Sequence, residues 1–216
     1  MNSVLEPILQ SPRLKEYVEE LSSFMKNEDE NRRHFYATMT EQEKVEFING
    51  EVVTQSPVIR KHNVIGKLLL KLLDTFVFKH QLGFVGYEKI LIKLTRNDFE
   101  PDVCFFRKEV ADQFSDKTMF FPTPDFVVEI LSKSTEKNDR GVKFEDYAFH
   151  GVKEYWIIDP DKETVEQYVL DEEKNYQLIS KVYEGMIHAK AIAGFDIPVK
   201  AIFDEAACNE ALKQMI

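Results

Sequence analysis

Cysteine is scarce in this sequence of 216 residues, which contains only Cys104 and Cys208. Two cysteines do not supply a disulfide framework, and these two lack the spacing of metal ligands. Cys104 lies within an apolar run, so it is predicted to be a small core residue. This cysteine usage is typical of a reducing compartment, and we expect a cytoplasmic protein.

Long apolar runs are also missing, and no stretch approaches the length of a membrane span. The N-terminus, MNSVLEPILQSPRLK, lacks the basic start and hydrophobic core of a signal peptide. There are no internal repeats and no low-complexity tracts. We therefore expect no membrane partner, and one sizeable domain or one domain with an appendage.

Positive charge is in deficit, because the formal net charge is −10. Such acidity argues against general coating of nucleic acid. The charge is uneven, however. Residues 59–96 carry eight bases against two acids, a net +6, which leaves −16 for the remainder. This basic segment is either a surface that faces a polyanion or an amphipathic helix with lysines in water, and the second is the simpler interpretation.

Residues 1–44 are predicted to form an N-terminal helical extension. Ser11-Pro12 is a good helix start, with an N-cap followed by proline in the first turn. Apolar residues then recur at helical spacing as far as Met25, and the acidic stretch KNEDENRR is predicted to end the helix as a linker. We expect the extension to pack on the main body or on a second subunit. The apolar residues are Leu14, Val18, Leu21 and Met25.

Residues 45–216 are predicted to form the main α/β domain. The run VEFINGEVV alternates around Asn49-Gly50, which is a strong hairpin signal. Residues 61–79 give the clearest helical pattern, closed by Gly83. Further strands and one helix follow, and their order implies a mixed sheet flanked by helices. The strands are expected at 87–94, 101–106, 125–131, 154–159, 164–170 and 176–183, and the helix at about 138–150 with Gly151 as its stop.

A lone carboxylate, Glu129, stands near the end of the apolar run 125–131. A buried carboxylate needs a hydrogen bond, a cation or a metal as its partner. Asp125 lies about 13 Å away along the same strand, too far to share one ion easily. Asp102 begins the preceding strand and converges with Glu129 if the two strands pair. Two carboxylates with water suit Mg²⁺, although Pro-Asp also caps strands and turns.

The helix at about 138–150 brings Asp139, Lys143 and Tyr147 to one face, because they follow one another at steps of four residues. Asp139 and Lys143 are either an ordinary surface ion pair or part of a functional site. Tyr147 is equally well explained as a core residue.

Three segments carry a resemblance to a known family: PDVCFF, PDFVVEILSKST and DRGVKFEDYAFHGVKEYWIIDP. They resemble the Uma-type family of restriction endonucleases, within the PD-(D/E)XK nuclease superfamily. The resemblance covers roughly residues 45–205 and is most specific over 124–160. It implies a restriction-endonuclease-like core, here with the N-terminal extension and added β-hairpins.

The resemblance also implies roles for single residues. Asp102 and Glu129 match the metal ligands, which the main-chain carbonyl of Ile130 assists. The position where the motif has its lysine is Leu131 in this chain. The resemblance implies that Lys143 takes that role, with Lys133 as the alternative.

Glu51 and His62 match further family positions. Glu51 is either an additional acidic member of the site or a solvent-facing hairpin residue, and His62 is either a site residue or a helix-capping residue. Asp125 and Asp159 are better explained as residues that form turns or cap strands. Tyr155 and Trp156 are expected in the core and on the sheet face.

The expected function is therefore metal-dependent hydrolysis of DNA phosphodiester bonds, with Mg²⁺ or Mn²⁺ as cofactor. Double-stranded DNA is the expected partner, and a homodimer is expected by analogy with restriction enzymes. The alternative is a catalytically inactive module with a nuclease fold that binds DNA or protein, because fold alone does not deliver activity. A hydrolase of another phosphate ester is a third possibility.

Overall fold

The computed structural model describes residues 4–40 and 43–215, and its centre is a six-stranded mixed sheet. The strand order is β11-β10-β9-β8-β6-β3. Strands β8 and β9 run parallel, and the other neighbouring pairs run antiparallel. The strands are β3 (Gly83–Tyr87), β6 (Val103–Arg107), β8 (Phe126–Ile130), β9 (Glu154–Asp159), β10 (Thr164–Leu170) and β11 (Tyr176–Val182).

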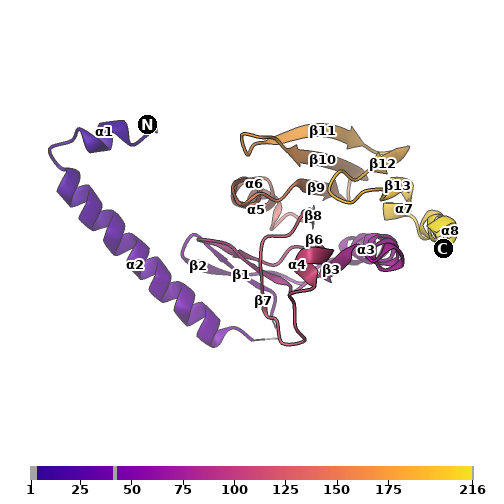
Figure 1. Ribbon diagram of the computed structural model, residues 1–216, viewed down its shortest axis with the longest axis horizontal. Coiled ribbons are helices and arrows are strands. Elements are labelled where there is room, and N and C mark those ends of the chain that lie inside the picture. Colours follow the sequence, from indigo (N-terminus) through magenta and orange to yellow (C-terminus); the bar gives the residue numbers. More distant parts are fainter. Residues whose placement is uncertain (1–3, 41–42, 216) are drawn as a thin grey trace.

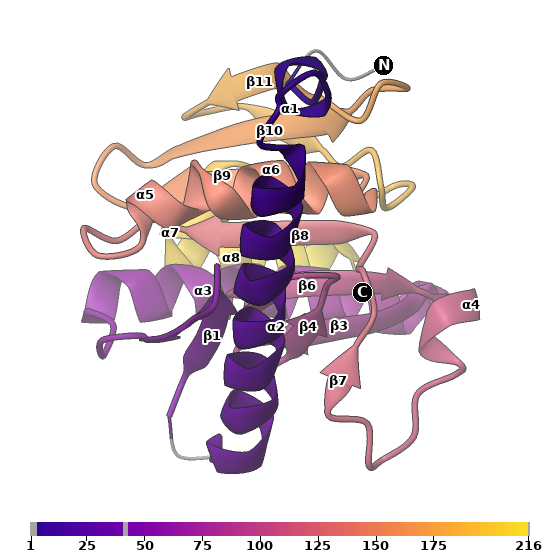
Figure 2. The ribbon, with the colours of Figure 1, turned by 90° about the vertical axis from the view of Figure 1, so that its left-hand side faces the viewer.

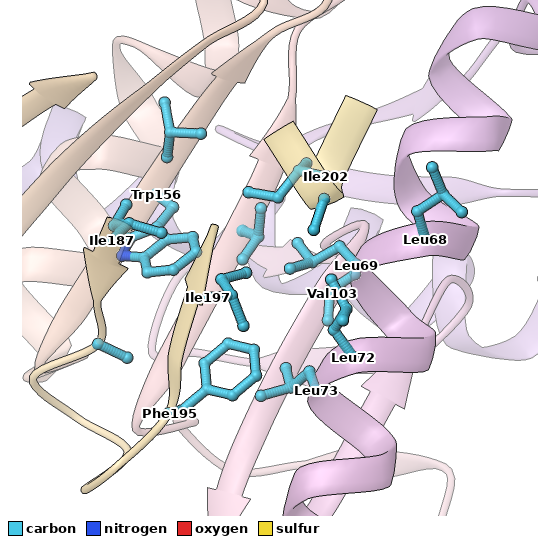
Figure 3. Close-up of a cluster of buried hydrophobic side chains, with 14 of the residues drawn as sticks. Leu68, Leu69, Leu72, Leu73, Val103, Trp156, Ile187, Phe195, Ile197 and Ile202 are labelled. Carbon is cyan, nitrogen blue, oxygen red and sulfur yellow. The ribbon is translucent and has the colours of Figure 1, made fainter. Parts of the chain in front are cut away.

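Helices cover both faces of this sheet (Figure 1). Helix α3 (Arg60–His80) packs on one face, where its leucines share a buried cluster with Trp156 and residues of the C-terminal segments (Figure 3). Helix α6 (Val142–His150) packs on the other face through Tyr147. Every residue of β8 is buried, as is typical of a central strand with helices on both sides. The predicted mixed sheet with flanking helices is confirmed.

A second sheet of five strands, in the order β2-β1-β5-β4-β7, lies beside the first. Its hairpin is the predicted one, with Asn49 and Gly50 at φ +51° and +87°. The strands are β1 (Val45–Ile48), β2 (Glu51–Thr54), β4 (Leu91–Lys93), β5 (Asp98–Phe99) and β7 (Phe120–Phe121). The remaining elements are α1 (Glu6–Leu9), α2 (Leu14–Thr38), α4 (Lys108–Ala111), α5 (Glu136–Asp139), β12 (Met186–His188), β13 (Asp196–Pro198), α7 (Lys200–Phe203) and α8 (Glu205–Met215).

The prediction that KNEDENRR forms a linker is wrong, because helix α2 runs unbroken through these residues. The predicted start is also wrong, because the helix begins at Leu14 and its N-cap is Arg13, not Ser11. The polar side chains in this stretch have partners on the body. Glu28 pairs with Arg96 at 2.8 Å, and Arg32 binds Asp98. The sequence of this stretch therefore suggests a solvent-exposed segment, but its side chains attach the helix to the body. The division at residue 44 stays a prediction, and residues 41–42 lie outside the described part of the chain.

The predicted helix over 61–79 is confirmed as α3, but Gly83 does not close it. The left-handed C-cap is Gln81, at φ +53°, and Gly83 is the first residue of β3. A Cβ at Gly83 would lie 2.0 Å from the carbonyl oxygen of Phe106 on the next strand. The glycine is therefore required by the close approach of two strands and not by the end of the helix.

The predicted strand over 87–94 is also wrong, because the chain changes sheets within it. Strand β3 ends at Tyr87, and β4 belongs to the second sheet. Glu88 and Lys89 take positive φ values of +45° and +28° between them. The predicted helix at 138–150 is two helices, α5 and α6, separated around Gly141. Gly151 stops α6 as predicted, at φ +85°.

The other predicted strands are found close to their predicted bounds, as β6, β8, β9, β10 and β11. Cys104, Tyr155 and Trp156 are fully buried, as expected. Within the described residues, no helix is both long and apolar enough to cross a membrane.

Candidate active site

The register of β6 and β8 brings Asp102 and Glu129 to the same place. Val103 lies opposite Val128 in this antiparallel pair, so the next residues outward along the two strands are Asp102 and Glu129. The backbone N–H of Ile130 donates to Asp102 Oδ2 at 2.8 Å. Residues opposite one another project to the same face of a sheet. Both carboxylates line one cavity of about 670 Å³.

The rest of that cavity comes from segments far apart in the sequence. His62 enters from the first turn of α3, and Lys143 from α6. The loop at 131–136 and the turn at 159–162 supply the remaining polar wall, and residues 55–59 supply most of the apolar wall. The side chains of Asp102, Glu129 and Lys143 are buried, so the charges lie in the wall and not on an open surface.

Lys143 is held by three carboxylates. Its Nζ lies 2.8 Å from Glu46 Oε1, 3.0 Å from Glu129 Oε1 and 3.2 Å from Asp139 Oδ1. Burial opposes the ammonium form, but these carboxylates raise the pKa of Lys143 well above its ordinary value. Lys143 therefore stays charged and orients the carboxylate of Glu129, to which Tyr147 also donates at 3.3 Å.

For the acids around Lys143, burial favours the protonated, neutral form. It raises the pKa of Glu129 well above the ordinary value, and the charge of Lys143 only partly offsets this. Burial also raises the pKa of Asp139. One lysine therefore does not neutralise the cluster, which favours a bound proton or a second cation.

Asp102 is stabilised as a carboxylate. Lys44 Nζ lies 3.0 Å from its Oδ1, and His62 Nε2 lies 3.2 Å from its Oδ2. Burial alone would raise the pKa of Asp102, but His62, Lys44 and the N–H of Ile130 hold it well below the ordinary value. His62 Nε2 also lies 2.8 Å from the carbonyl oxygen of Ile130. Both neighbours are acceptors, so this nitrogen carries the hydrogen.

Sequence reasoning missed Lys44, Glu46 and Glu100. Glu46 lies in β1 and accepts a hydrogen bond from the N–H of Glu100 at 2.9 Å. Burial raises the pKa of Glu100 to about 7. Every residue of β1 is buried, so the alternating pattern hid Glu46 by assigning it to the solvent face. The sequence did contain a signal for this buried acid, because Glu46 stands between the apolar residues Val45 and Phe47. A charge within an apolar run is also the feature that drew attention to Glu129.

One expected site residue lies outside the cavity, and another lines it from an exposed loop. Glu51 is exposed on β2, outside the residues that line the cavity, and Glu46 of the same hairpin approaches Lys143 instead. Lys133 lines the cavity but is exposed in the loop beyond β8, which ends at Ile130. Of the two lysines considered, Lys143 is therefore the one that contacts Glu129.

The two aspartates assigned to turns and strand caps have such contacts. Asp125 accepts a hydrogen bond from the backbone N–H of Arg107, the last residue of β6, and pairs with the side chains of Arg107 and Lys153 at 2.6 and 2.8 Å. It lies at the other end of β8 from Glu129. Asp159 accepts hydrogen bonds from the N–H groups of Asp161 and Lys162. It lines the cavity through the turn that it organises.

The donors present fit a hard divalent cation. Two carboxylates and the Ile130 carbonyl are oxygen ligands, and Mg²⁺ is bound by one or two carboxylates with retained water. Over residues 4–40 and 43–215, no group of three or more His, Cys, Asp or Glu side chains is arranged as a complete metal site. The excess of acids near Asp102 and Glu129 favours a cation there. The buried acids are Glu46, Glu100, Asp102, Glu129 and Asp139, against the ammonium groups of Lys44 and Lys143 and the imidazole of His62.

The mixed sheet and its flanking helices match the fold of a nuclease-like structure. A crystal structure described as "a putative nuclease belonging to DUF820 from Anabaena variabilis" superimposes with a TM-score of 0.66. The match covers 82% of this chain and 96% of that chain, at 17% sequence identity. At this identity the likeness shows the fold alone.

The chain belongs to the Uma2 family, whose model is described as "Putative restriction endonuclease" and matches residues 32–200. Two similar proteins come from Synechocystis. The protein sll1609 is 31% identical over 129 residues, which is 58% of this chain and 72% of that protein. The protein slr1290 is 27% identical over 169 residues, which is 76% of this chain and 85% of that protein. The family resemblance seen in the sequence motifs is confirmed.

Proposed function

We propose that this chain is a metal-dependent endonuclease that hydrolyses phosphodiester bonds of double-stranded DNA. The observation that carries the proposal is the convergence of Asp102, Glu129 and Lys143 in the buried wall of one cavity. Membership of the Uma2 family and the nuclease-like fold support it. Mg²⁺ or Mn²⁺ is the proposed cofactor, and a homodimer provides two sites for two strands.

Asp102, Glu129 and the carbonyl of Ile130 would hold the divalent cation. Such an ion polarises a phosphoryl oxygen and lowers the pKa of a water molecule. Lys143 keeps the carboxylate of Glu129 fixed from the helix side, and Lys44 and His62 do the same for Asp102. Because three carboxylates keep Lys143 protonated, it contributes positive charge near the phosphate and does not act as a base.

The DNA backbone beyond the cleaved phosphate would be bound outside the cavity. His62 opens onto the cavity from the first turn of α3, and the exposed residues Arg60, Lys61, Lys67 and Lys71 belong to the same helix. Lysine and arginine contacts to phosphates supply most of the sequence-independent affinity of DNA-binding proteins. Helix α3 is therefore the proposed guide for the DNA backbone.

The direct test of this function is cleavage of supercoiled plasmid DNA. We expect nicked and then linear product with Mg²⁺ or Mn²⁺, and none when a chelator removes the ion. Product that is unaffected by the chelator would contradict metal dependence. Intact plasmid under all metal conditions would contradict the nuclease activity itself.

The alternative function is an inactive module with a nuclease fold, and the replacement of the motif lysine by Leu131 motivates it. Metal binding separates the two functions. At about 100 times the dissociation constant, a bound ion adds about 2.7 kcal/mol of stability, which raises the melting temperature of a chain of this size by about 5–10 °C. We expect this rise in a thermal melt with Mn²⁺. A melting temperature that ignores Mn²⁺ and Mg²⁺ would favour the inactive module.

A further inference from the structure

The N-terminal half of α2 carries an apolar surface that the described residues leave largely uncovered. This half of the helix stands away from the two sheets, with α1 beyond its start, while the C-terminal half lies against the body (Figures 1 and 2). A groove of about 620 Å³ separates α1 from α2. Six large apolar side chains here are 47–65% exposed, namely Leu5, Leu9, Val18, Leu21, Phe24 and Met25.

The exposed apolar residues of α2 lie on the same face of the helix that contacts the body in its C-terminal half. In the C-terminal half, Glu28 pairs with Arg96, Arg32 with Asp98, and Phe35 stacks on Phe47. Glu28, Arg32 and Phe35 follow one another at steps of four and three residues. Going back along the helix, the same alternation gives Met25, Leu21, Val18 and Leu14. This is the a/d repeat of paired helices. We call this row of residues the seam: its C-terminal part packs on the body, and its N-terminal part, from Leu14 to Met25, extends beyond the body.

We propose that the N-terminal half of α2 binds the same segment of a second copy of this chain. Charge favours a like partner. The residues that flank the seam are Lys15, Tyr17, Ser22 and Phe24, so no acid borders it. The acids Glu16, Glu19 and Glu20 lie at the heptad positions farther from the seam. Two copies therefore meet through apolar side chains without placing like charges against one another.

The body of the chain decides the direction of this pairing. The seam of the C-terminal half is occupied by the chain's own second sheet and neighbouring loop. A parallel second helix would need that occupied space for its own C-terminal half. An antiparallel helix needs only the free segment over residues 14–25, about 18 Å long. It sets Leu14 opposite Met25 of the partner subunit and Val18 opposite Leu21 of the partner subunit.

The paired segment over residues 14–25 has to supply the area that a specific interface needs. A specific interface buries at least about 1,000 Å² in total, or about 500 Å² from each chain. Within residues 14–25, the exposed side chains of Val18, Leu21, Phe24 and Met25 supply the apolar centre of this area, and the polar side chains around them supply its rim. Leu9 of α1 and Leu5, which directly precedes that helix, are further exposed apolar residues beyond the start of α2.

Sedimentation of the full chain over a concentration series tests the interface. We expect a dimer for the native chain, and for Leu21→Glu a dissociation constant raised at least about 30-fold, since a charge would enter the centre of the seam. Ser23→Glu adds the same charge on the opposite face and should leave the dimer intact. Leu21 is exposed in the single chain, so the fold should persist, which circular dichroism checks. A monomeric native chain, or a Leu21→Glu variant that dimerises as tightly, would overturn the proposal.

Disulfide trapping tests the antiparallel direction. The native Cys104 and Cys208 are buried and do not compete. A chain with both Leu14→Cys and Met25→Cys should form a disulfide-linked dimer on oxidation. Leu14→Cys alone should not, because two copies of residue 14 would lie about 16 Å apart along the antiparallel pair. Efficient crosslinking by Leu14→Cys alone would show a parallel pair and overturn the antiparallel arrangement.

Discussion

Replacement of Asp102 by Asn should reduce metal-dependent DNA cleavage by roughly 10³-fold, because a bound ion supplies several kcal/mol of transition-state stabilisation. Asn keeps the shape of the side chain and an oxygen acceptor for the N–H of Ile130, but it removes the charge that would hold the ion. The rate of plasmid nicking under saturating Mn²⁺ measures the effect. The thermal shift with Mn²⁺ should be lost in the same variant.

A matched control separates this result from a general loss of acidity. Asp112→Asn removes one exposed carboxylate that pairs with Lys108, away from the residues that line the cavity. We expect native cleavage from this control. Native cleavage by Asp102→Asn, with its thermal response to Mn²⁺ intact, would remove Asp102 from the metal site.

Replacement of Lys143 by Met should lower the free energy of unfolding by about 3–5 kcal/mol, the cost of removing one partner from a buried ion pair. Its side chain is 1% exposed, and its Nζ lies within 3.2 Å of carboxylate oxygens of Glu46, Glu129 and Asp139. Without the lysine these acids repel one another in a buried cluster. Urea unfolding at neutral pH measures the loss, and Lys137→Met, an exposed lysine of α5, is the control.

The loss in Lys143→Met should depend on pH in a defined direction. Burial already raises the pKa of Glu129 and Asp139, and removal of the ammonium raises these values further. The folded variant then binds more protons than the unfolded chain above the ordinary carboxyl pKa of about 4. Its deficit relative to the native chain should therefore shrink as the pH falls from neutrality towards that value. A deficit that grows over this range would contradict the buried acid cluster.

The parts of the fold that sequence reasoning predicted are those set by local pattern. Helix α3 has an uninterrupted apolar stripe, the hairpin has Asn-Gly, and β8 is a short run of buried apolar residues. The pair Asp102 and Glu129 was predicted because Asp102 begins one apolar run, Glu129 stands near the end of the next, and adjacent strands lie close together. Their contacts with Lys44 and His62 needed the register and the placement of α3, which no local pattern contains.

The wrong predictions share one physical cause, which is tertiary contact. The polar stretch in α2 stays helical because Glu28 and Arg32 find partners 68 and 66 residues later in the chain. The run over 87–94 looks like one strand because its apolar residues belong to two different sheets. The alternating pattern of β1 predicts that Glu46 faces solvent, but both faces of this strand are buried. Local propensity is overridden in each case by long-range packing.

The central claim is that Asp102 and Glu129 hold one divalent ion. A crystal structure of the chain with Mn²⁺, recorded with anomalous scattering, tests it most directly. We predict one anomalous peak between these two carboxylates, within about 2.3 Å of an oxygen of each and of the Ile130 carbonyl. A fully folded chain with no peak there at saturating Mn²⁺, or with its ion held by other residues, would contradict the claim.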